Sequence, residues 1–265
     1  MNISSIKHYI IIRFYCFNMM ENEKLFDYNL LHDGVNVFKH YTLKSLENQT
    51  NKNFEILFMI HNDISDDHAA IVELKSIKSN ININVVHYKD VNEFINKNDN
   101  KYDFLITTRI DHDDLIYSDA VKEIQNKCNI NIPLYYNGYA NGITMINNNF
   151  NDCYKFYPKY DNGSISIFQS LIVNKKIFNK NLNIYSLGQH NKQLDTFIDL
   201  YKNYKYNESY FNINNLEDAY IYVKHDFNHS SLVNPGFNEN WHRTNIKVDK
   251  SKEWFIERFG NFIDN

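Results

Sequence analysis

The first half of the chain alternates apolar, β-rich runs with segments whose apolar residues recur at helical spacing. The runs predict buried strands at 8–17, 54–63, 83–89 and 103–111, and the segments predict helices at 33–50, 66–79, 91–98 and 118–128. Consecutive parallel strands need a crossover connection, and a helix is the usual one. The alternation therefore predicts an α/β fold with a mostly parallel central sheet and helices on both faces.

The second half is less regular. It predicts strands with turns at the glycines in 134–148 and 153–163, a strand leading into a turn at 164–178, a helix at 190–204, a strand at 219–231 and a terminal helix at 252–263. We expect Asp33 to cap the first helix and Ser118 or Asp119 to cap the fourth. Because no internal repeat or Pro/Ser-rich linker interrupts the pattern, we predict a single domain over residues 1–265.

Composition excludes several classes of protein. The net charge of −4 and the absence of a basic block argue against a nucleic-acid partner. The apolar run at 9–17 is interrupted by Arg13 and is shorter than the roughly 20 residues of a membrane span, so we expect no integral membrane segment. Cys16, Cys128 and Cys153 are odd in number and have no metal-like spacing, which predicts reduced thiols in a cytoplasmic protein.

Three carboxylates crowd the end of the fourth predicted strand, at Asp111, Asp113 and Asp114. Like charges this close repel one another unless a cation lies between them. Mg²⁺ and Mn²⁺ prefer oxygen ligands, and either ion can neutralise a diphosphate leaving group. The alternative is a solvated acidic turn followed by a helix cap.

Other polar residues end neighbouring strands. Arg13 ends the first predicted strand, His61–Asp63 end the second, and Arg109 precedes the acidic cluster. In open α/β sheets, ligands bind outside the carboxyl ends of the strands, so these residues are expected to face one ligand site. Arginine forks match phosphate oxygens, which makes Arg13 and Arg109 candidates for a diphosphate, although Arg109 has an intramolecular salt bridge to the cluster as its alternative.

Two stretches resemble a known family. "HYTLKSLENQTNKNFEILFMIHND" (40–63) and "FLITTRIDHDDLIYSDAV" (104–121) are similar to segments of family-two-like GT-A glycosyltransferases, which bind nucleotide sugars. The "TTRIDHDD" form, with "LYYNGYANG" (134–142) and "YVKHDFNHSS" (222–231), most resembles the putative rhamnosyltransferase family of bacteria and some large viruses. The resemblance covers most of residues 6–230. It implies a nucleotide-sugar-binding half at 6–125 and an acceptor-binding half at 126–265.

The resemblance assigns roles to the acidic cluster and its neighbours. It makes Asp111 and Asp113 the DxD pair, with Asp113 the direct metal ligand and Asp111 in contact with the nucleotide sugar or its metal, and it leaves Asp114 in either role. Asp63 corresponds to the position that holds the nucleotide base or ribose, although this chain has "HND" where "DDGS" is commoner. His225 would complete the metal shell, with a hydrogen-bonded surface histidine as the alternative.

An inverting transfer also needs a general base for the acceptor hydroxyl. Asp195 is the first candidate, and Glu217 or Asp218 the second; an ordinary solvated carboxylate is the alternative for each. A retaining mechanism needs no such base, and the stereochemistry stays open.

The chain is thus predicted to be a glycosyltransferase that depends on Mn²⁺ or Mg²⁺. It would move a sugar, with rhamnose as one candidate, from a nucleotide-diphosphate donor to a glycan or another hydroxyl acceptor. The first alternative is a catalytically inactive GT-A-like module that binds a glycan or a partner protein. The second is a metal-dependent nuclease or phosphatase, against which the missing basic clusters and the "QTNKNFE" segment argue. Donor sugar, nucleotide base, acceptor and oligomeric state stay open.

Overall fold

Two β-sheets organise the computed structural model, which describes residues 5–15, 27–99, 101–146, 149–157, 168–178, 182–188, 192–203, 211–224 and 243–263. In these ranges, the central sheet has the strand order β10-β6-β9-β4-β1-β2-β3 and the second sheet the order β12-β8-β7-β11-β5. The central strands are β1 (Ile6–Phe14), β2 (Glu55–Ile60), β3 (Ile83–His87), β4 (Phe104–Asp111), β6 (Leu134–Tyr139), β9 (Gln169–Asn174) and β10 (Phe211–Asn214). The second sheet contains β5 (Leu115–Ile116), β7 (Gly142–Ile146), β8 (Asn149–Phe156), β11 (Tyr220–Lys224) and β12 (Arg243–Lys247).

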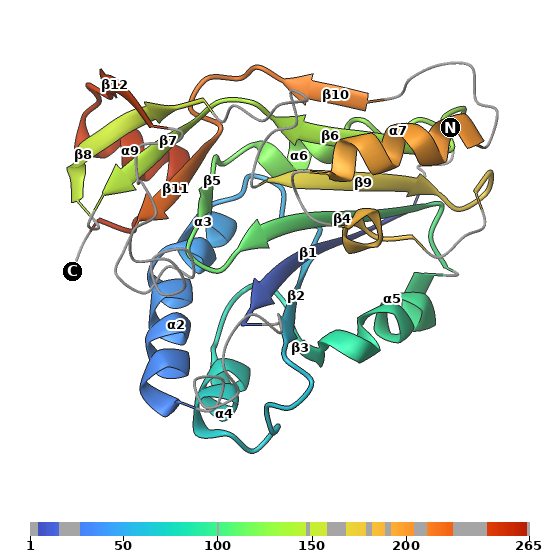
Figure 1. The fold of residues 1–265 in the computed structure, drawn as a ribbon, viewed down its shortest axis with the longest axis horizontal. Coiled ribbons are helices and arrows are strands. Elements are labelled where there is room, and N and C mark those ends of the chain that lie inside the picture. Colours follow the sequence, from blue (N-terminus) through green and yellow to red (C-terminus); the bar gives the residue numbers. More distant parts are fainter. Residues whose placement is uncertain are drawn as a thin grey trace.

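The central sheet is largely parallel. β1 pairs in parallel with β2 and β4, β2 with β3, and β6 with β10, whereas β9 runs antiparallel to both β4 and β6. The helices are α2 (Tyr28–His40), α3 (Thr42–Glu47), α4 (Ala69–Ser76), α5 (Val91–Asp99), α6 (Ala120–Gln125), α7 (Gln193–Asn203) and α9 (Lys252–Phe259). Two 3-10 turns, η1 (Tyr88–Asp90) and η2 (Ile184–Leu187), complete the described elements. The predicted α/β fold, with a largely parallel sheet flanked by helices, is confirmed (Figure 1).

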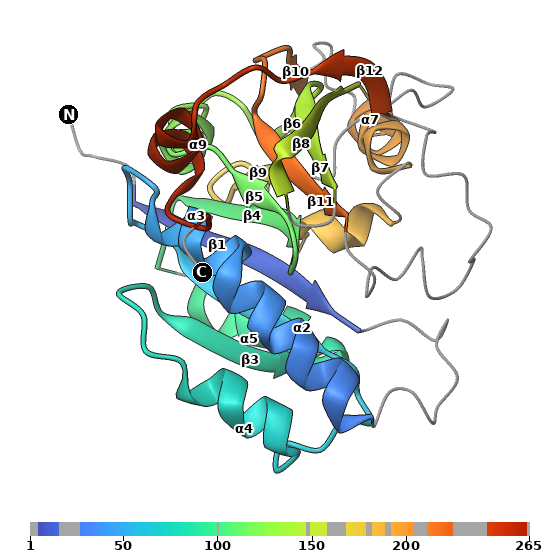
Figure 2. The same cartoon turned by 90° about the vertical axis from the view of Figure 1, so that its left-hand side faces the viewer.

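Alternating side chains of β1 build two cores. Ile10 and Ile12 point into a cluster with α2, α3, α4, α6 and α9, whereas Tyr9 and Ile11 point into a cluster with α5, η2 and α7. This follows from the two-residue period of a strand buried on both faces. Figure 2 shows α2 and α4 together on one face of the sheet. Whether a candidate residue of β1 or β4 faces the first or the second core therefore depends on whether its residue number is even or odd.

The first helix differs from its predicted form. The helix cap is Asp27, whose side chain accepts hydrogen bonds from the backbone N–H groups of Asn29 and Leu30. Asp33 lies inside α2, so its prediction as the cap is wrong, because the buried stripe begins a turn earlier, at Leu31. The predicted helix also divides at Tyr41, which separates α2 from α3. At the fourth predicted helix, Asp119 occupies the cap position of α6 without a side-chain capping bond.

The chain passes from the central sheet to the second sheet between β6 and β7. Gly138 lies inside β6, and the turn predicted at the glycines falls at Ala140 and Asn141 instead. Gly142 begins β7 with its backbone against Tyr220, since a Cβ there would lie 2.4 Å from the tyrosine ring. Among the helices of the described residues, none combines the length and the apolar character needed to cross a bilayer.

Candidate functional site

Arg13 and Asp111 stand opposite each other in the register of β1 and β4, at the carboxyl edge of the sheet. The Arg13 guanidinium lies 3.3 Å from the Asp111 carboxylate, and both side chains remain partly exposed. The sequence predicted this meeting, because parallel neighbours end at the same edge.

Arg109 lies on the same face as Asp111, two residues earlier in β4. Its side chain is 2% exposed, and its terminal nitrogen is 3.5 Å from Asp111. The guanidinium carbon lies 6.0 Å from the centre of the Tyr185 ring in η2, and Nε has no hydrogen-bond partner among the described residues. Burial of a guanidinium is costly unless its donors are matched. Arg109 therefore keeps donor capacity for an anionic group.

Asp113 and Asp114 are buried beside Asp111, at 6% and 1% exposure. Neither carboxylate oxygen of Asp114 has a hydrogen-bond partner of normal geometry within the described ranges. Burial raises the pKa of the Asp114 carboxyl well above its usual range, and the charges of Asp113 and Asp111 raise it further; the backbone N–H of Val223 and the charge of Arg109 oppose the shift only in part. The cluster thus holds more negative charge than its protein surroundings compensate.

The second sheet fixes the position of this cluster. β5 follows Asp114 directly and pairs antiparallel with β11, so that Leu115 lies opposite Ile221. One residue beyond β5, the backbone N–H of Tyr117 donates to the carbonyl of Ala219 at 3.1 Å. The carboxylates therefore lie at the connection between β4 of the central sheet and β5 of the second sheet.

Gln49 and Thr50, the "QT" of the family-like motif, bind the residues that follow the acidic cluster, at 117–121. The backbone N–H of Thr50 donates to the carbonyl of Ser118 at 2.8 Å, and the Thr50 hydroxyl donates to the carboxylate of Asp119 at 2.6 Å. Gln49 makes three further bonds to the surrounding backbone. The motif that carries the resemblance thus acts in this chain as a clamp on the residues after the acidic cluster.

Asp63 and Asp195 occupy different borders of the site. Asp63 follows β2, is 69% exposed at its side chain and lies 3.7 Å from His61. Asp195 is in the first turn of α7, on the sheet face of Arg109. Burial raises the pKa of Tyr136 in β6, while Arg109 lowers it and Asp195 raises it, so both charges lie near this phenol. The fold thus brings Asp195 to the Arg109 side of the sheet.

Glu217 and Asp218 have structural partners instead. Lys155 of β8 lies 3.2 Å from Glu217 and 2.6 Å from Asp218, and the Tyr157 hydroxyl donates to Glu217. Both candidate bases therefore lie in ion pairs with β8. His225 lies outside the described residues, as does Cys16.

Sequence reasoning did not single out Tyr15 or Tyr185. Tyr15 has a φ of 44°, a rare value for a residue other than glycine, and its ring packs 5.5 Å from that of His112. Burial and then the charges of Asp113 and Asp33 raise its pKa, which places the phenol beside the cluster. Its position two residues after Arg13 was the available signal for Tyr15. No periodic pattern covers the segment around Tyr185.

The donor set fits a hard cation in its chemistry. Its ligands are carboxylate oxygens, and the two buried oxygens of Asp114 make no hydrogen bond of normal geometry among the described residues. Within those same ranges, no group of three or more His, Cys, Asp or Glu side chains forms a preassembled metal site. A bound Mg²⁺ or Mn²⁺ would thus need the carboxylates to converge further, or ligands from the substrate.

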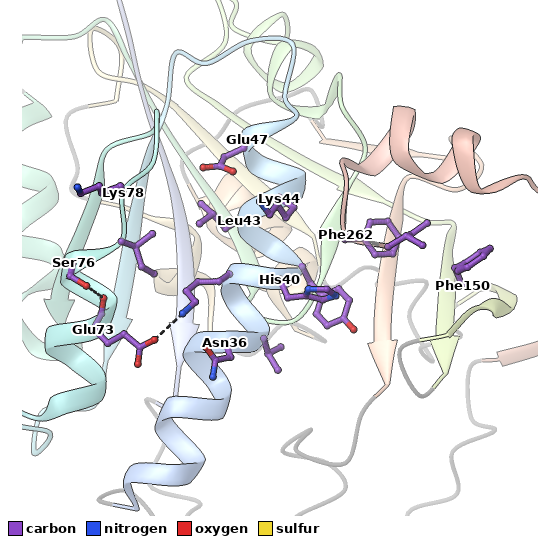
Figure 3. A pocket seen from close by; sticks show the side chains of 15 residues that line it. Asn36, His40, Leu43, Lys44, Glu47, Glu73, Ser76, Lys78, Phe150 and Phe262 are labelled. Carbon is purple, nitrogen blue, oxygen red and sulfur yellow. Dashed lines mark hydrogen bonds and ion pairs between the residues drawn. The ribbon is translucent and has the colours of Figure 1, made fainter. Parts of the chain in front are cut away.

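A separate groove of about 1040 Å³ lies beside α2 and α3 (Figure 3). Lys39 spans part of its wall and lies 2.8 Å from Glu73 of α4, while Phe150 and Phe262 border the far end. The strand-end residues and Asp195 do not line this groove. It is therefore distinct from the carboxylate site.

The central sheet, with carboxylates following its inner strand β4, defines a mixed α/β fold with a largely parallel sheet flanked by helices. A family model described as "putative rhamnosyl transferase" matches residues 19–235. The chain belongs to this family.

Solved structures with similarity to the chain include several transferases. TarS of S. aureus (residues 1–349) has a TM-score of 0.41 and 14% identity, over 82% of this chain and 60% of TarS, so the chain spans less than two thirds of that structure. A putative glucose-1-phosphate thymidylyltransferase from Bacillus anthracis has a TM-score of 0.40 and 11% identity, over 86% of this chain and 92% of that one. A putative nucleotide-diphospho-sugar transferase from Desulfovibrio desulfuricans has a TM-score of 0.40 and 10% identity, over 92% of each chain. No curated protein matches the sequence.

Proposed function

We propose that this chain is a glycosyltransferase that depends on Mn²⁺ or Mg²⁺ and transfers a sugar from a nucleotide-diphosphate donor to a hydroxyl of a glycan or glycoconjugate. The observation that carries the proposal is the Asp114 carboxylate, buried beside Asp113 and Asp111 with neither oxygen in a hydrogen bond of normal geometry among the described residues. A compact, water-excluded set of like charges is costly without a counter-ion. Rhamnose is the candidate sugar because of the family description.

Two arginines would hold the donor. Arg13 and Arg109 both reach Asp111 from the same face of the sheet, at 3.3 and 3.5 Å. A diphosphate could accept from the remaining guanidinium donors, including the buried Nε of Arg109, without further cost of burying that charge. Asp113 and Asp111 would hold the divalent cation, and His225 is proposed as a further ligand. When bound, the ion would neutralise the developing charge of the nucleotide diphosphate.

The other carboxylates have roles at the border of the site. We assign Asp63 to the base or ribose of the nucleotide, because it is exposed after β2, the strand next to β1. Asp195 would accept the proton of the acceptor hydroxyl if the transfer inverts, because α7 places it on the Arg109 face. A cytoplasmic location remains part of the proposal, in line with the unpaired Cys128 and Cys153.

A donor screen tests this function. Each of a set of UDP-, GDP- and dTDP-sugars is incubated with the protein and Mn²⁺ or Mg²⁺, and release of the nucleotide diphosphate is measured. We expect release with at least one donor, its loss on chelation of the metal, and its recovery when metal is restored.

Variants separate the cluster from the rest of the surface. Asp113→Ala should abolish release without unfolding the chain, whereas Asp67→Ala, at an exposed carboxylate after β2, should leave it unchanged. Full activity of Asp113→Ala would overturn the metal role. Stabilisation by a nucleotide sugar without any release, in a thermal-shift assay, would favour the inactive binding module instead.

A further inference from the structure

The terminal helix α9 lies outside residues 19–235, the part of the chain that the family model matches, yet it packs against the segment that follows the acidic cluster. Figure 2 shows it beside α3 and β5. Phe255 and Phe259 enter the same core as α3 and α6, and the side chain of Asn48 donates to the carbonyl of Glu257 at 3.0 Å. The helix thus contacts the candidate site's supporting layer directly.

Arg258 makes the contacts that matter most for the site. Its Nε donates to the carbonyl of Asp218 at 2.9 Å, and a terminal nitrogen donates to the carbonyl of Glu217 at 3.0 Å. Its guanidinium carbon lies 5.2 Å from the centre of the Tyr117 ring. The carbonyl of Arg258 also accepts from the backbone N–H of Ser118 at 2.8 Å. One residue therefore binds the segment before β11 and the segment after β5.

The backbone at Asp218 has an uncommon conformation. Its φ of 56° lies in the left-handed region, which few residues besides glycine, asparagine and aspartate adopt. Such a conformation persists where surrounding contacts over-determine it. Here the contacts are the two bonds from Arg258 and the 2.6 Å ion pair with Lys155.

These two segments decide where the carboxylates lie. β5 begins directly after Asp114, and its partner β11 begins two residues after Asp218. Between the two segments, Tyr117 donates to the carbonyl of Ala219, and Leu115 pairs with Ile221. If the segments shift relative to each other, Asp113 and Asp114 shift with β5.

We propose that Arg258 is a positioning residue for the acidic cluster, through the proposed metal ligand Asp113 and its neighbour Asp114. It acts by joining the start of β11 to the end of β5 and touches no reacting group. The inference rests on the proposed function, because it assumes that the acidic cluster binds the divalent ion. It extends the functional unit beyond the matched family segment to the C-terminal helix.

Mn²⁺ binding measured by electron paramagnetic resonance tests the inference without any substrate. In Arg258→Met, the apolar stem remains and both backbone bonds are lost, so we expect Mn²⁺ affinity to fall by about 10–100-fold, as for outer-shell residues of metal sites. Arg258→Lys keeps the charge without the planar fork and should lie between Met and wild type. Raising Mn²⁺ should restore nucleotide-diphosphate release by Arg258→Met.

Lys250→Met is the matched control. The Lys250 Nζ lies 5.5 Å from the centre of the Trp254 ring in α9. None of the contacts described for Lys250 reaches residues 117–118 or 217–219. It should bind Mn²⁺ like the wild type, even if its melting temperature falls. Wild-type Mn²⁺ affinity in a folded Arg258→Met protein would overturn the inference. If that variant does not fold, unchanged affinity in Arg258→Lys overturns it.

The two proposals fail in different ways. A wild-type protein that binds no Mn²⁺ and releases no nucleotide diphosphate refutes the proposed function, and the role of Arg258 with it. A wild-type protein that does both, together with an Arg258→Met protein that binds Mn²⁺ equally well, refutes only the role of Arg258.

Discussion

Gln49 and Tyr117 are joined by a 2.9 Å hydrogen bond from the side-chain amide of the first to the backbone carbonyl of the second. The same amide nitrogen donates to the carbonyl of Ser45, and the amide oxygen accepts from the backbone N–H of Val121 at 3.1 Å. Gln49 is 2% exposed. One buried amide thus satisfies backbone groups on both sides of the segment that links the acidic cluster to α6.

Gln49→Leu should therefore destabilise the protein more than a change of side-chain volume would. The substitution leaves buried backbone groups at Tyr117 and Val121 without their partner, at roughly 1–3 kcal/mol for each unsatisfied group. We expect a loss of about 2–6 kcal/mol in denaturant unfolding. Lys44→Gln, at an exposed position of α3, the helix that ends just before Gln49, is the control and should change stability by less than about 0.5 kcal/mol. Equal stabilities of the two variants would show that the clamp contributes nothing.

Asp114→Asn should raise the stability of the metal-free protein and weaken its response to metal. The substitution removes one of three crowded carboxylates, one whose oxygens make no hydrogen bond of normal geometry in the described part of the chain. A gain of about 1 kcal/mol corresponds to a melting temperature higher by about 2–4 °C for a domain of 150–250 residues. Mn²⁺ should stabilise the variant less than it stabilises the wild type, because a ligand that binds the folded state less tightly raises its stability less.

Thermal melts with and without Mn²⁺ measure both effects in one experiment. Asp67→Asn, at an exposed carboxylate, should change neither quantity. A lower metal-free melting temperature for Asp114→Asn would mean that the carboxylate stabilises the fold by itself, contrary to the repulsion argued from its burial.

Gly188 and Gly260 provide a matched pair for the cost of backbone strain and of steric contact. Both have positive φ, of 85° and 90°, in a region that is essentially limited to glycine. A Cβ at Gly188 would meet no atom within 4 Å, whereas one at Gly260 would lie 2.6 Å from the carbonyl oxygen of Lys44. Gly188→Ala should cost about 1–3 kcal/mol from strain alone.

Gly260→Ala should cost more, because it also pushes α9 away from α3. Chemical denaturation of the two variants gives the comparison. If Gly260→Ala proves no more costly than Gly188→Ala, then α9 can move away from α3 easily, and it would be a poor support for the acidic cluster.

The sequence predicted the parallel half of the fold and the meeting of its strand ends for the same reason. Buried strands separated by helices leave few topologies, and parallel strands end at one edge, so Arg13 and Asp111 could be placed together before their 3.3 Å contact was known. The antiparallel course of β9 was not predicted, because one apolar run reads alike in both directions. The short strands β5 and β10 gave too few residues for a periodic signal, and β12 (RTNIK) is too polar to show an apolar one.

The supporting contacts of the site could not be read from local patterns. Gln49 and Tyr117 are 68 residues apart in the sequence, and Arg258 and Asp218 are 40 apart. Such pairs depend on how the two sheets dock, which no window of the sequence encodes. For the same reason, Glu217 and Asp218 resembled candidate bases, although the structure pairs both with Lys155.

His8 should make the protein's stability depend on pH in the acid range. It is buried in β1, with Nε2 2.7 Å from the Thr108 hydroxyl and Nδ1 3.3 Å from the side-chain nitrogen of Gln125. Burial lowers the pKa of His8 from 6.5 to about 3. Between these two values, the unfolded chain binds a proton at His8 that the folded chain does not. The free energy of unfolding should therefore fall with falling pH, by up to about 1.4 kcal/mol per pH unit from this residue.

His8→Leu should remove this contribution. Thr108 keeps its 2.8 Å contact with Ser170 and Gln125 keeps its bond to the carbonyl of Asn53, so the substitution leaves neither partner unsatisfied. At pH 7 the variant should be less stable than wild type by about 1 kcal/mol, from its lost hydrogen bonds. By pH 5 the difference should vanish or reverse, because only the wild type still loses stability through His8. Denaturant unfolding at pH 7, 6 and 5 measures the difference, and curves that stay parallel over this range would show that the folded protein binds a proton at His8 as readily as the unfolded chain does, contrary to its lowered pKa.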